Sequence, residues 1–365
     1  MGARSELNFE SKVPNPKWLG GGQLRTIAVI VLIAGAIYCW PQETGALNSY
    51  LRQQIGLRDD QIRALNSGKA VSKTLPSRTP AEIFVFGAVY INAPPDAYVK
   101  LSTDIDRLAK MAHYTAFGTF STPPQLTDLE GFTFDSDEIS SLRKCFPGKC
   151  QIQLPGSAIA DFQQTIDWSA PNAEEQVNQL VQKRALRRVN AYLQAGNAAL
   201  GEYNDKGKPA DIAGQFQDIL SYSAALPDWL PAFYPYLLSY PLQKPANVDE
   251  RFYWAKMNFG LKPTLRIVHV VVMRGKIAGY PVNAIAEKQI YASHYFQTAL
   301  DLAFCLSSTP DADKPGFYLI QIMASEQADL TGAKGSVIRM VAEDRLPTPL
   351  QKWLTEIKNA LEDTR

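Results

Sequence analysis

Runs of apolar residues after residue 80 predict β-strands in two groups, one before residue 136 and one after residue 246. Residues 81–92 (AEIFVFGAVYIN) are rich in β-branched and aromatic side chains and are apolar on both faces of the predicted strand. Similar patterns between turn residues predict further strands over 112–120, 129–135, 250–259, 264–274, 290–306, 316–326 and 335–344. The last five follow one another through short gaps, so they predict antiparallel rather than parallel pairing.

The predicted strand over 290–306 alternates with a period of two. Its even positions are mostly apolar and include His294, whereas its odd positions include Ser293 and Asp301. This pattern predicts a long, half-buried strand with Ser293 and His294 on opposite faces. The adjacent Ser–His pair is therefore not expected to form a catalytic dyad.

Apolar residues at spacings of three and four predict helices in three regions after residue 80. One follows two prolines over 93–111, and another covers 347–362 near the end of the chain. The apolar stripe of the second is formed by Leu350, Trp353, Leu354, Ile357 and Leu361. Between the two strand groups, 172–203 and 209–226 also have helical spacing. Residues 136–246 are therefore predicted to form a helical insertion.

The first 80 residues predict a membrane anchor and a connection. Residues 1–25 combine proline, glycine and charge, which indicates a flexible cytoplasmic tail. Residues 26–40, Thr26 to Trp40, contain no charge and predict a single transmembrane helix. Basic residues precede this segment, so the N-terminus is expected to stay in the cytoplasm and the chain after residue 40 is expected to be exported across the inner (cytoplasmic) membrane. A cleaved signal peptide is the alternative. Residues 41–80 are predicted to be a helix followed by a linker.

Together these patterns predict an α+β fold with a large insertion. A curved antiparallel sheet, drawn from 81–135 and 247–365, is expected to pack on the long C-terminal helix. The stretches EIFVFGAVYINAPPDAYVKLSTDIDRL (82–108) and PLQKWLTEIKNAL (349–361) resemble START-like helix-grip (SRPBCC) ligand-binding domains in element order. The resemblance implies that an Ala-Pro-Pro turn leads from the first strand into a helix and that the last helix closes a hydrophobic cavity. The insertion departs from the usual compact domain.

Composition and charge narrow the classes of partner. The chain has 365 residues, with 46% hydrophobic and 20% charged residues, which suffices for a sizeable core. A net charge of +1 excludes the large basic excess typical of a nucleic-acid-binding protein. The basic cluster of Lys183, Arg184, Arg187 and Arg188 is interpreted as a solvated helix face.

The cysteine spacing favours an exported protein. Cys145 and Cys150 enclose Pro147-Gly148, which suits a type II turn that brings the two thiols together. A disulfide is expected in an oxidising compartment, and two unpaired thiols are the alternative. Cys305 lies in an apolar run and is expected to be a buried free thiol.

No sequence motif predicts a catalytic centre, a cofactor or a metal. Nucleophile elbows, Walker and Rossmann glycine patterns and zinc-ligand spacings are all missing from the sequence. If the sheet lines a cavity, ligand contacts are predicted for His269, His294, Tyr291, Tyr295 and Phe296. The alternative for both histidines is a satisfied position in the core.

An aromatic and proline-rich stretch over 227–241 is a candidate contact surface. Contact with a partner or with the membrane is predicted for Trp229, Phe233, Tyr234 and Tyr236. The alternative is that these rings pack the insertion against the sheet.

Three functional hypotheses remain from the sequence. The first is a non-catalytic, membrane-anchored envelope protein that binds a hydrophobic or lipid-like ligand. The second is a structural or interaction subunit that docks an envelope partner through the insertion. The third is a hydrolase-like enzyme using His294. The sequence leaves the identity of the ligand and of the partner open.

Overall fold

The computed structural model describes most of the chain from residue 42 onward. By its internal contacts the chain divides into Met1–Thr44 and Gly45–Arg365, and the features below belong to the second unit. The described residues are 42–222, 229–258, 262–311, 313, 315–327, 330, 335, 339 and 346–363. The predicted tail and anchor, and nearly all of the predicted strand 335–344, lie outside them. None of the helices in these residues is both long and apolar enough to cross a bilayer.

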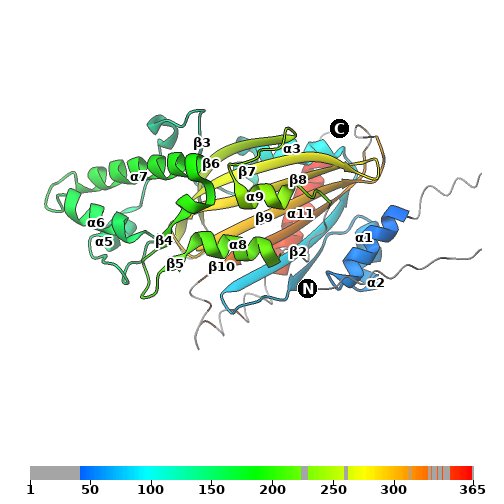
Figure 1. The fold of residues 1–365 in the computed structure, drawn as a ribbon, viewed down its shortest axis with the longest axis horizontal. Coiled ribbons are helices and arrows are strands. Elements are labelled where there is room, and N and C mark those ends of the chain that lie inside the picture. The colour runs from blue at the N-terminus through cyan, green and yellow to red at the C-terminus, as the bar shows by residue number, and fades with distance from the viewer. Residues whose placement is uncertain are drawn as a thin grey trace, which may run out of the picture. The chain divides into compact units, whose positions relative to one another are not determined.

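The described residues form a large antiparallel sheet of eight strands, ordered β1-β2-β10-β9-β8-β7-β6-β3 (Figure 1). The strands are β1 (Val71–Leu75), β2 (Glu82–Ile91), β3 (Ala116–Thr119), β6 (Val248–Asn258), β7 (Pro263–Ile277), β8 (Tyr280–Ala292), β9 (Thr298–Ser307) and β10 (Phe317–Glu326). Ala278 and Gly279 join β7 to β8 with φ of 49° and 92°. Positive φ at both turn residues matches the right-handed twist of the flanking strands. The predicted α+β class with a large antiparallel sheet is confirmed.

Each face of the sheet carries its own apolar core. One core joins β2 and β10 to α11 (Pro347–Glu362) and α3 (Pro95–Thr103), next to α4 (Ile105–Met111). The other joins the opposite face to the helices between β3 and β6. Along β9 the two faces alternate, because Leu300 and Leu302 belong to the second core and Ala303 and Cys305 to the first. The sheet is therefore covered by helices on both sides.

The C-terminal helix lies closely on β2. Its buried side chains are Leu350, Leu354, Ile357 and Leu361, which are four of the five predicted stripe residues. A Cβ added at Gly87 of β2 would lie 2.7 Å from Leu354 Cδ1, so the glycine permits this close approach. Trp353, the fifth stripe residue, is half-buried beside the same core.

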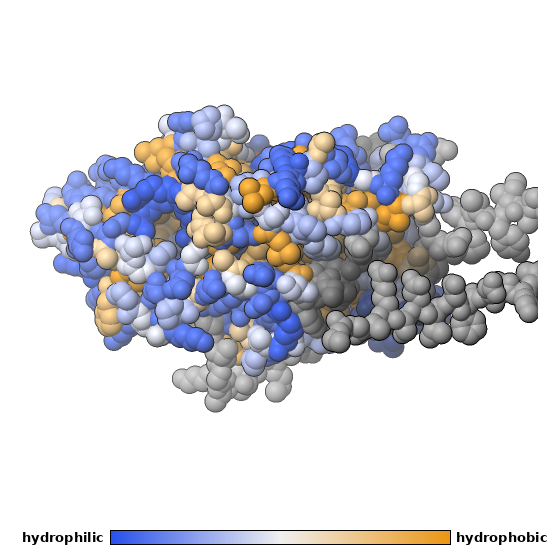
Figure 2. Space-filling model, in the orientation of Figure 1, coloured by the Kyte–Doolittle hydropathy of each residue, from blue (hydrophilic) through white to orange (hydrophobic). Residues whose placement is uncertain are grey.

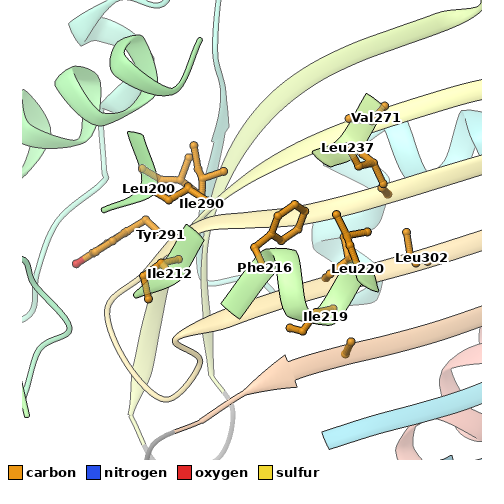
Figure 3. Packing of buried hydrophobic residues seen from close by; sticks show 14 of the residues in the cluster. Leu200, Ile212, Phe216, Ile219, Leu220, Leu237, Val271, Ile290, Tyr291 and Leu302 are labelled. Carbon is orange, nitrogen blue, oxygen red and sulfur yellow. The ribbon is translucent and has the colours of Figure 1, made fainter. Parts of the chain in front are cut away.

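The residues between β3 and β6 contain mostly helices. They form η1 (Leu126–Leu129), α5 (Ser136–Leu142), α6 (Gly156–Thr165), α7 (Ala173–Ala195), η2 (Gly196–Leu200), a small sheet of β4 (Glu202–Tyr203) and β5 (Ala210–Asp211), α8 (Ile212–Tyr222) and α9 (Phe233–Ser239). Figure 3 shows α8 directing Phe216 and Leu220 toward the sheet near Leu302. The outward side of α8 and α9 faces the viewer in Figure 2, where the surface is mostly hydrophilic with scattered apolar groups.

The structure joins Cys145 and Cys150, with the two sulfur atoms 2.10 Å apart and the Cα atoms 4.6 Å apart. Phe146 and Lys149 form an antiparallel bridge inside this loop, and Gly148 has a φ of 84°. Cys305 is a buried free thiol on β9.

The predicted single strand over 290–306 is wrong. β8 ends at Ala292, β9 begins at Thr298, and residues 293–297 form the connection between them. Strand alternation therefore does not determine the direction of His294. The prediction also missed residues 280–289 of β8, because their alanines and a proline give a weak strand signal on their own. Pairing with β7 and β9 on either side overrides that weak propensity.

Local hydrogen bonds explain the break between β8 and β9. The Ser293 hydroxyl accepts a hydrogen bond from the Leu265 backbone N–H at 3.0 Å. Tyr295 has a φ of 63°, in the left-handed region that a regular strand does not use. Both features turn the chain away from β8.

Four other predicted elements differ from the structure. The predicted helix 172–203 ends as α7 at Ala195, and Glu202–Tyr203 form β4. Residues 71–75, within the predicted linker, form the edge strand β1 after the helices α1 (Gln42–Gln53) and α2 (Asp59–Asn66). Residues 129–135 form no strand, because Phe132 and Phe134 are buried among core side chains instead. The predicted helix 93–111 is divided at Asp104, whose carboxylate accepts the Arg107 N–H and so begins α4.

Candidate ligand-binding site

A cavity of about 420 Å³ lies between the sheet and the helices α11, α3 and α4. Its apolar walls include Ile83 of β2, Leu101 of α3, Leu108 of α4 and Trp353 of α11. The volume falls within the roughly 300–1,000 Å³ range of small-molecule sites. The lining surface is mostly apolar, and its polar side chains come from the sheet, from α3 and from neighbouring loops.

The positions of the helices explain why space remains here. α11 lies over β1 and β2, where Gly87 permits close contact, whereas α3 lies over β8 and β9. The two helices thus cover different parts of one sheet face. The cavity occupies the space between them, above β7, β8, β9 and β10.

Three charged side chains on neighbouring strands line this cavity. Arg266 comes from β7, Glu287 from β8 and Asp301 from β9. Glu287 and Asp301 are direct cross-strand partners, a position in which Cβ atoms are about 4.5–5.5 Å apart. Two like charges at this separation repel, so ionisation of one carboxylate opposes ionisation of the other.

The surroundings shift the ionisation of all three groups. Burial raises the pKa of Glu287 to about 7, and the facing Asp301 adds to the rise. Burial also raises the pKa of Asp301, although Arg266 acts in the opposite direction. Burial disfavours the charged form of Arg266, but nearby Tyr253 and Asp301 outweigh it, and the pKa of Arg266 rises. The guanidinium therefore stays charged beside two carboxylates that resist simultaneous ionisation.

Hydrogen bonds within the protein satisfy only some of the polar atoms of Arg266, Glu287 and Asp301. Tyr253 donates to Glu287 Oε2 at 2.9 Å, and Arg266 Nε donates to Gln289 Oε1 at 3.1 Å. Among the described residues, no group donates a hydrogen bond to the Asp301 carboxylate. No described residue accepts a hydrogen bond from Arg266 Nη2. Gln321 donates to the Tyr98 hydroxyl at 2.7 Å, whereas its buried Oε1 has no partner in the described part of the chain.

His269 lies on the opposite face of the sheet from this cavity. Its Nδ1 is 3.1 Å from the Tyr192 hydroxyl, and its ring stacks on Phe252 with centroids 4.3 Å apart. Burial lowers the pKa of His269 to about 4, even though Glu250 lies 3.5 Å from Nε2. The side chain is a neutral imidazole within the second core.

His294 connects the β8–β9 turn to the insertion. Its Nε2 is 2.7 Å from Glu138 Oε1 and its Nδ1 is 3.0 Å from the Gln151 carbonyl oxygen. His294 and Glu138 are 4% and 6% exposed. Both ring nitrogens are thus engaged in structural contacts, away from the cavity lining.

The other predicted ligand contacts separate from one another. Phe296 lines the cavity under α11. Tyr291 faces the insertion and lies beside Tyr203, with ring centroids 6.4 Å apart. The Tyr295 hydroxyl accepts the Lys262 backbone N–H at 2.7 Å. The structure therefore brings Phe296, but not the two tyrosines, to this cavity.

The aromatic residues predicted as a contact surface pack largely inward. Phe233 is fully buried, and Trp229 meets Phe304 of β9 with centroids 5.5 Å apart. The Tyr236 hydroxyl donates a hydrogen bond to Glu250. Tyr234 is half-buried beside Phe233. These rings join α9 to the sheet.

A second cavity of about 390 Å³ lies between α6, α7 and the sheet. Arg184, Arg187 and Arg188, from the cluster interpreted as a solvated face, line it together with Tyr291. Arg184 pairs with Asp161, and Arg188 donates to the backbone carbonyls of Ile290 and Leu200. Arg187 also lies 3.8 Å from Asp161, so three of the four residues of this cluster make contacts within the protein.

Sequence reasoning did not identify Arg266, Glu287 or Asp301. Asp301 was visible as a carboxylate between Leu300 and Leu302, but the odd face of its strand was interpreted as solvent-facing. Glu287 lies in the part of β8 that was not recognised. A charged residue inside an otherwise apolar strand is the sequence signal that could have identified this site.

Comparisons with known proteins add no assignment. The described residues contain no group of three or more His, Cys, Asp or Glu side chains arranged to hold a metal ion. The sequence matches no protein-family model, and no curated protein is detectably similar to it.

Proposed function

We propose that the chain is a non-catalytic binding protein that holds a hydrophobic or lipid-like molecule between its sheet and α11. The cavity of about 420 Å³, mostly apolar with a few polar side chains, is the observation that carries this proposal. An apolar surface of this kind gains free energy when it exchanges water for an apolar ligand.

The order of elements supports the resemblance to START-like helix-grip domains. The first long strand, β2, leads through Ala93-Pro94-Pro95 into α3. The helix α11 comes after β10, the last strand in the described residues, and lies on the same sheet face as α3. A cavity beneath the terminal helix is what that resemblance implies. The insertion remains an addition to the compact domain.

We further propose that residues 26–40 anchor the protein in the inner membrane, with the folded part exported. The charge-free segment after a basic tail motivates this topology. The close pairing of Cys145 with Cys150 suits an oxidising compartment.

The two alternatives have less support. Packing of Trp229 and Phe233 against the sheet removes them from a docking surface on the insertion. The engagement of both His294 nitrogens by Glu138 and Gln151 leaves no free ring nitrogen for a hydrolytic step.

Analysis of co-purifying molecules tests the proposal. The full chain is isolated in lipid nanodiscs, and its organic extract is compared with that of Ala299→Phe, which fills the cavity from β9. Ala191→Phe, on the exposed surface of α7, is the matched control. We expect an apolar molecule enriched with the wild type and the control but depleted in Ala299→Phe. Equal extracts from all three proteins would contradict the proposal.

A further inference from the structure

The cavity contains polar atoms that the protein itself leaves unpaired. They are the Asp301 carboxylate, Arg266 Nη2 and Gln321 Oε1, none of which has a hydrogen-bond partner among the described residues. Of these three groups only Gln321 Oε1 is fully shut off from water, whereas Arg266 is 8% exposed and Asp301 is half-buried. A buried polar group without a partner costs free energy, and a buried charge costs more. A bound molecule that pairs with these atoms removes that cost.

The unpaired atoms include both donors and acceptors. Arg266 Nη2 can only donate, whereas the Asp301 carboxylate is an acceptor when ionised. A ligand group that satisfies both must therefore accept one hydrogen bond and donate another. A hydroxyl or a primary amide does this, whereas an alkane or an alkyl halide donates none.

The charges that face the cavity argue against a charged ligand group. Repulsion between Glu287 and Asp301 favours a single negative charge on the pair, and Arg266 supplies one positive charge. A carboxylate on the ligand would add a second negative charge beside this pair. An ammonium group would meet the Arg266 guanidinium. An uncharged group avoids both repulsions.

We propose that the cavity selects an amphiphile whose head group is uncharged and both donates and accepts hydrogen bonds, as an alcohol or a primary amide does. This inference rests on the proposed function and names the class of ligand for the same site. One water occupies about 30 Å³ in the liquid, so the cavity has room for roughly fourteen groups of that volume. This is comparable to an alkyl chain of about twelve carbons with its head group.

Competition among ligands with one chain length tests the head group. The full chain in lipid nanodiscs is loaded with a neutral fluorescent probe, N-phenyl-1-naphthylamine, and empty nanodiscs supply the background. The competitors are 1-dodecanol, 1-chlorododecane, dodecanoate and dodecylammonium at pH 6.0, below the pKa of about 7 of Glu287, so that the Glu287–Asp301 pair carries a single negative charge. We expect dodecanol to displace the probe at the lowest aqueous concentration. The comparison with chlorododecane is the sharpest, because an apolar cavity without polar partners prefers the halide.

Two variants connect this preference to the unpaired atoms. Asp301→Leu and Gln321→Leu each remove an acceptor while keeping a similar volume. In each we expect the ratio of dodecanol to chlorododecane affinity to fall at least tenfold, since a site built to hydrogen-bond a hydroxyl discriminates strongly for it. Asp137→Leu, on the exposed surface of α5, should keep the wild-type ratio.

The outcomes separate this inference from the proposed function. Saturable probe binding with chlorododecane or either charged ligand preferred over dodecanol overturns the head-group inference alone. An unchanged ratio in both leucine variants overturns it as well. Failure of the wild type to bind the probe above the nanodisc background overturns the proposed function and this inference together.

Discussion

At the scale of single residues, burial determines the charge of Glu287. Burial and the facing Asp301 raise the pKa of Glu287 to about 7 in the folded protein, compared with an ordinary value of 4.5. The folded state therefore binds a proton that the unfolded state has released between these values. This contribution to stability is fully present below about pH 4.5 and is lost as the pH rises through 7.

The Glu287→Gln variant tests this dependence. Glutamine stays uncharged, so the wild type should lose stability relative to the variant between pH 5 and 7.5, by at most about 1.4 kcal/mol per pH unit. Denaturant midpoints of the full chain at several pH values measure the difference. Glu326, whose pKa burial and nearby Glu82 also raise to about 7, contributes a separate share that Glu326→Gln isolates. A constant difference between wild type and Glu287→Gln would contradict the assignment.

His294 is expected to act as a structural residue. Its removal in His294→Ala leaves the Glu138 carboxylate buried without its imidazole partner. Breaking a buried pair in this way costs about 3–5 kcal/mol, so the unfolding midpoint should fall markedly. His113→Asn, at an exposed position with a positive φ that asparagine tolerates, is the control and should change little. A stable His294→Ala protein would argue against this role.

The sequence predicted the surroundings of some of these residues poorly. The expectation that Ser293 and His294 form no dyad rested on strand alternation, whereas both residues lie in the turn between β8 and β9, where Ser293 contacts Leu265 and His294 contacts Glu138 and Gln151. The polar identity of Asp301 was visible. Its environment was not, because alternation distinguishes two faces of a strand without saying whether the polar face meets water or a cavity.

At the scale of elements, the contact between β2 and α11 determines where the cavity ends. Gly87→Val would place a side chain against Leu350 and Leu354, whose nearest atoms lie 2.8 and 2.7 Å from an added Cβ. Overpacking of this kind typically costs about 1–3 kcal/mol. Gly207→Val, at a position with no neighbouring atom within 4 Å, should be close to neutral. Thermal unfolding of the full chain measures both, and equal midpoints would contradict close packing here.

Strong local patterns predicted elements better than weak ones. The terminal helix and β2 were correctly placed, since a continuous apolar stripe and a β-branched run are signals carried by the segment itself. Residues 280–289 and β1 were missed because their strand structure depends on pairing with neighbours distant in sequence. The strand order, which brings Arg266, Glu287 and Asp301 together, likewise follows from long-range pairing.

At the scale of the whole molecule, the proposed topology predicts an uncleaved anchor. The intact mass of the protein isolated from membranes should include residues 1–40, and deletion of residues 26–40 should release the chain from the membrane fraction. The apolar segment is expected to stay in the bilayer because its transfer to water is unfavourable. A mature protein beginning after residue 40 would instead support a cleaved signal peptide.

The central claim is that the space beneath α11 binds a hydrophobic molecule. Titration of the full chain in nanodiscs with N-phenyl-1-naphthylamine, after subtraction of empty nanodiscs, measures this most directly. We predict saturable binding of one probe per chain that is lost in Ala299→Phe and retained in Ala191→Phe. Binding that does not saturate, or that persists unchanged when Ala299→Phe fills the cavity, would contradict the claim.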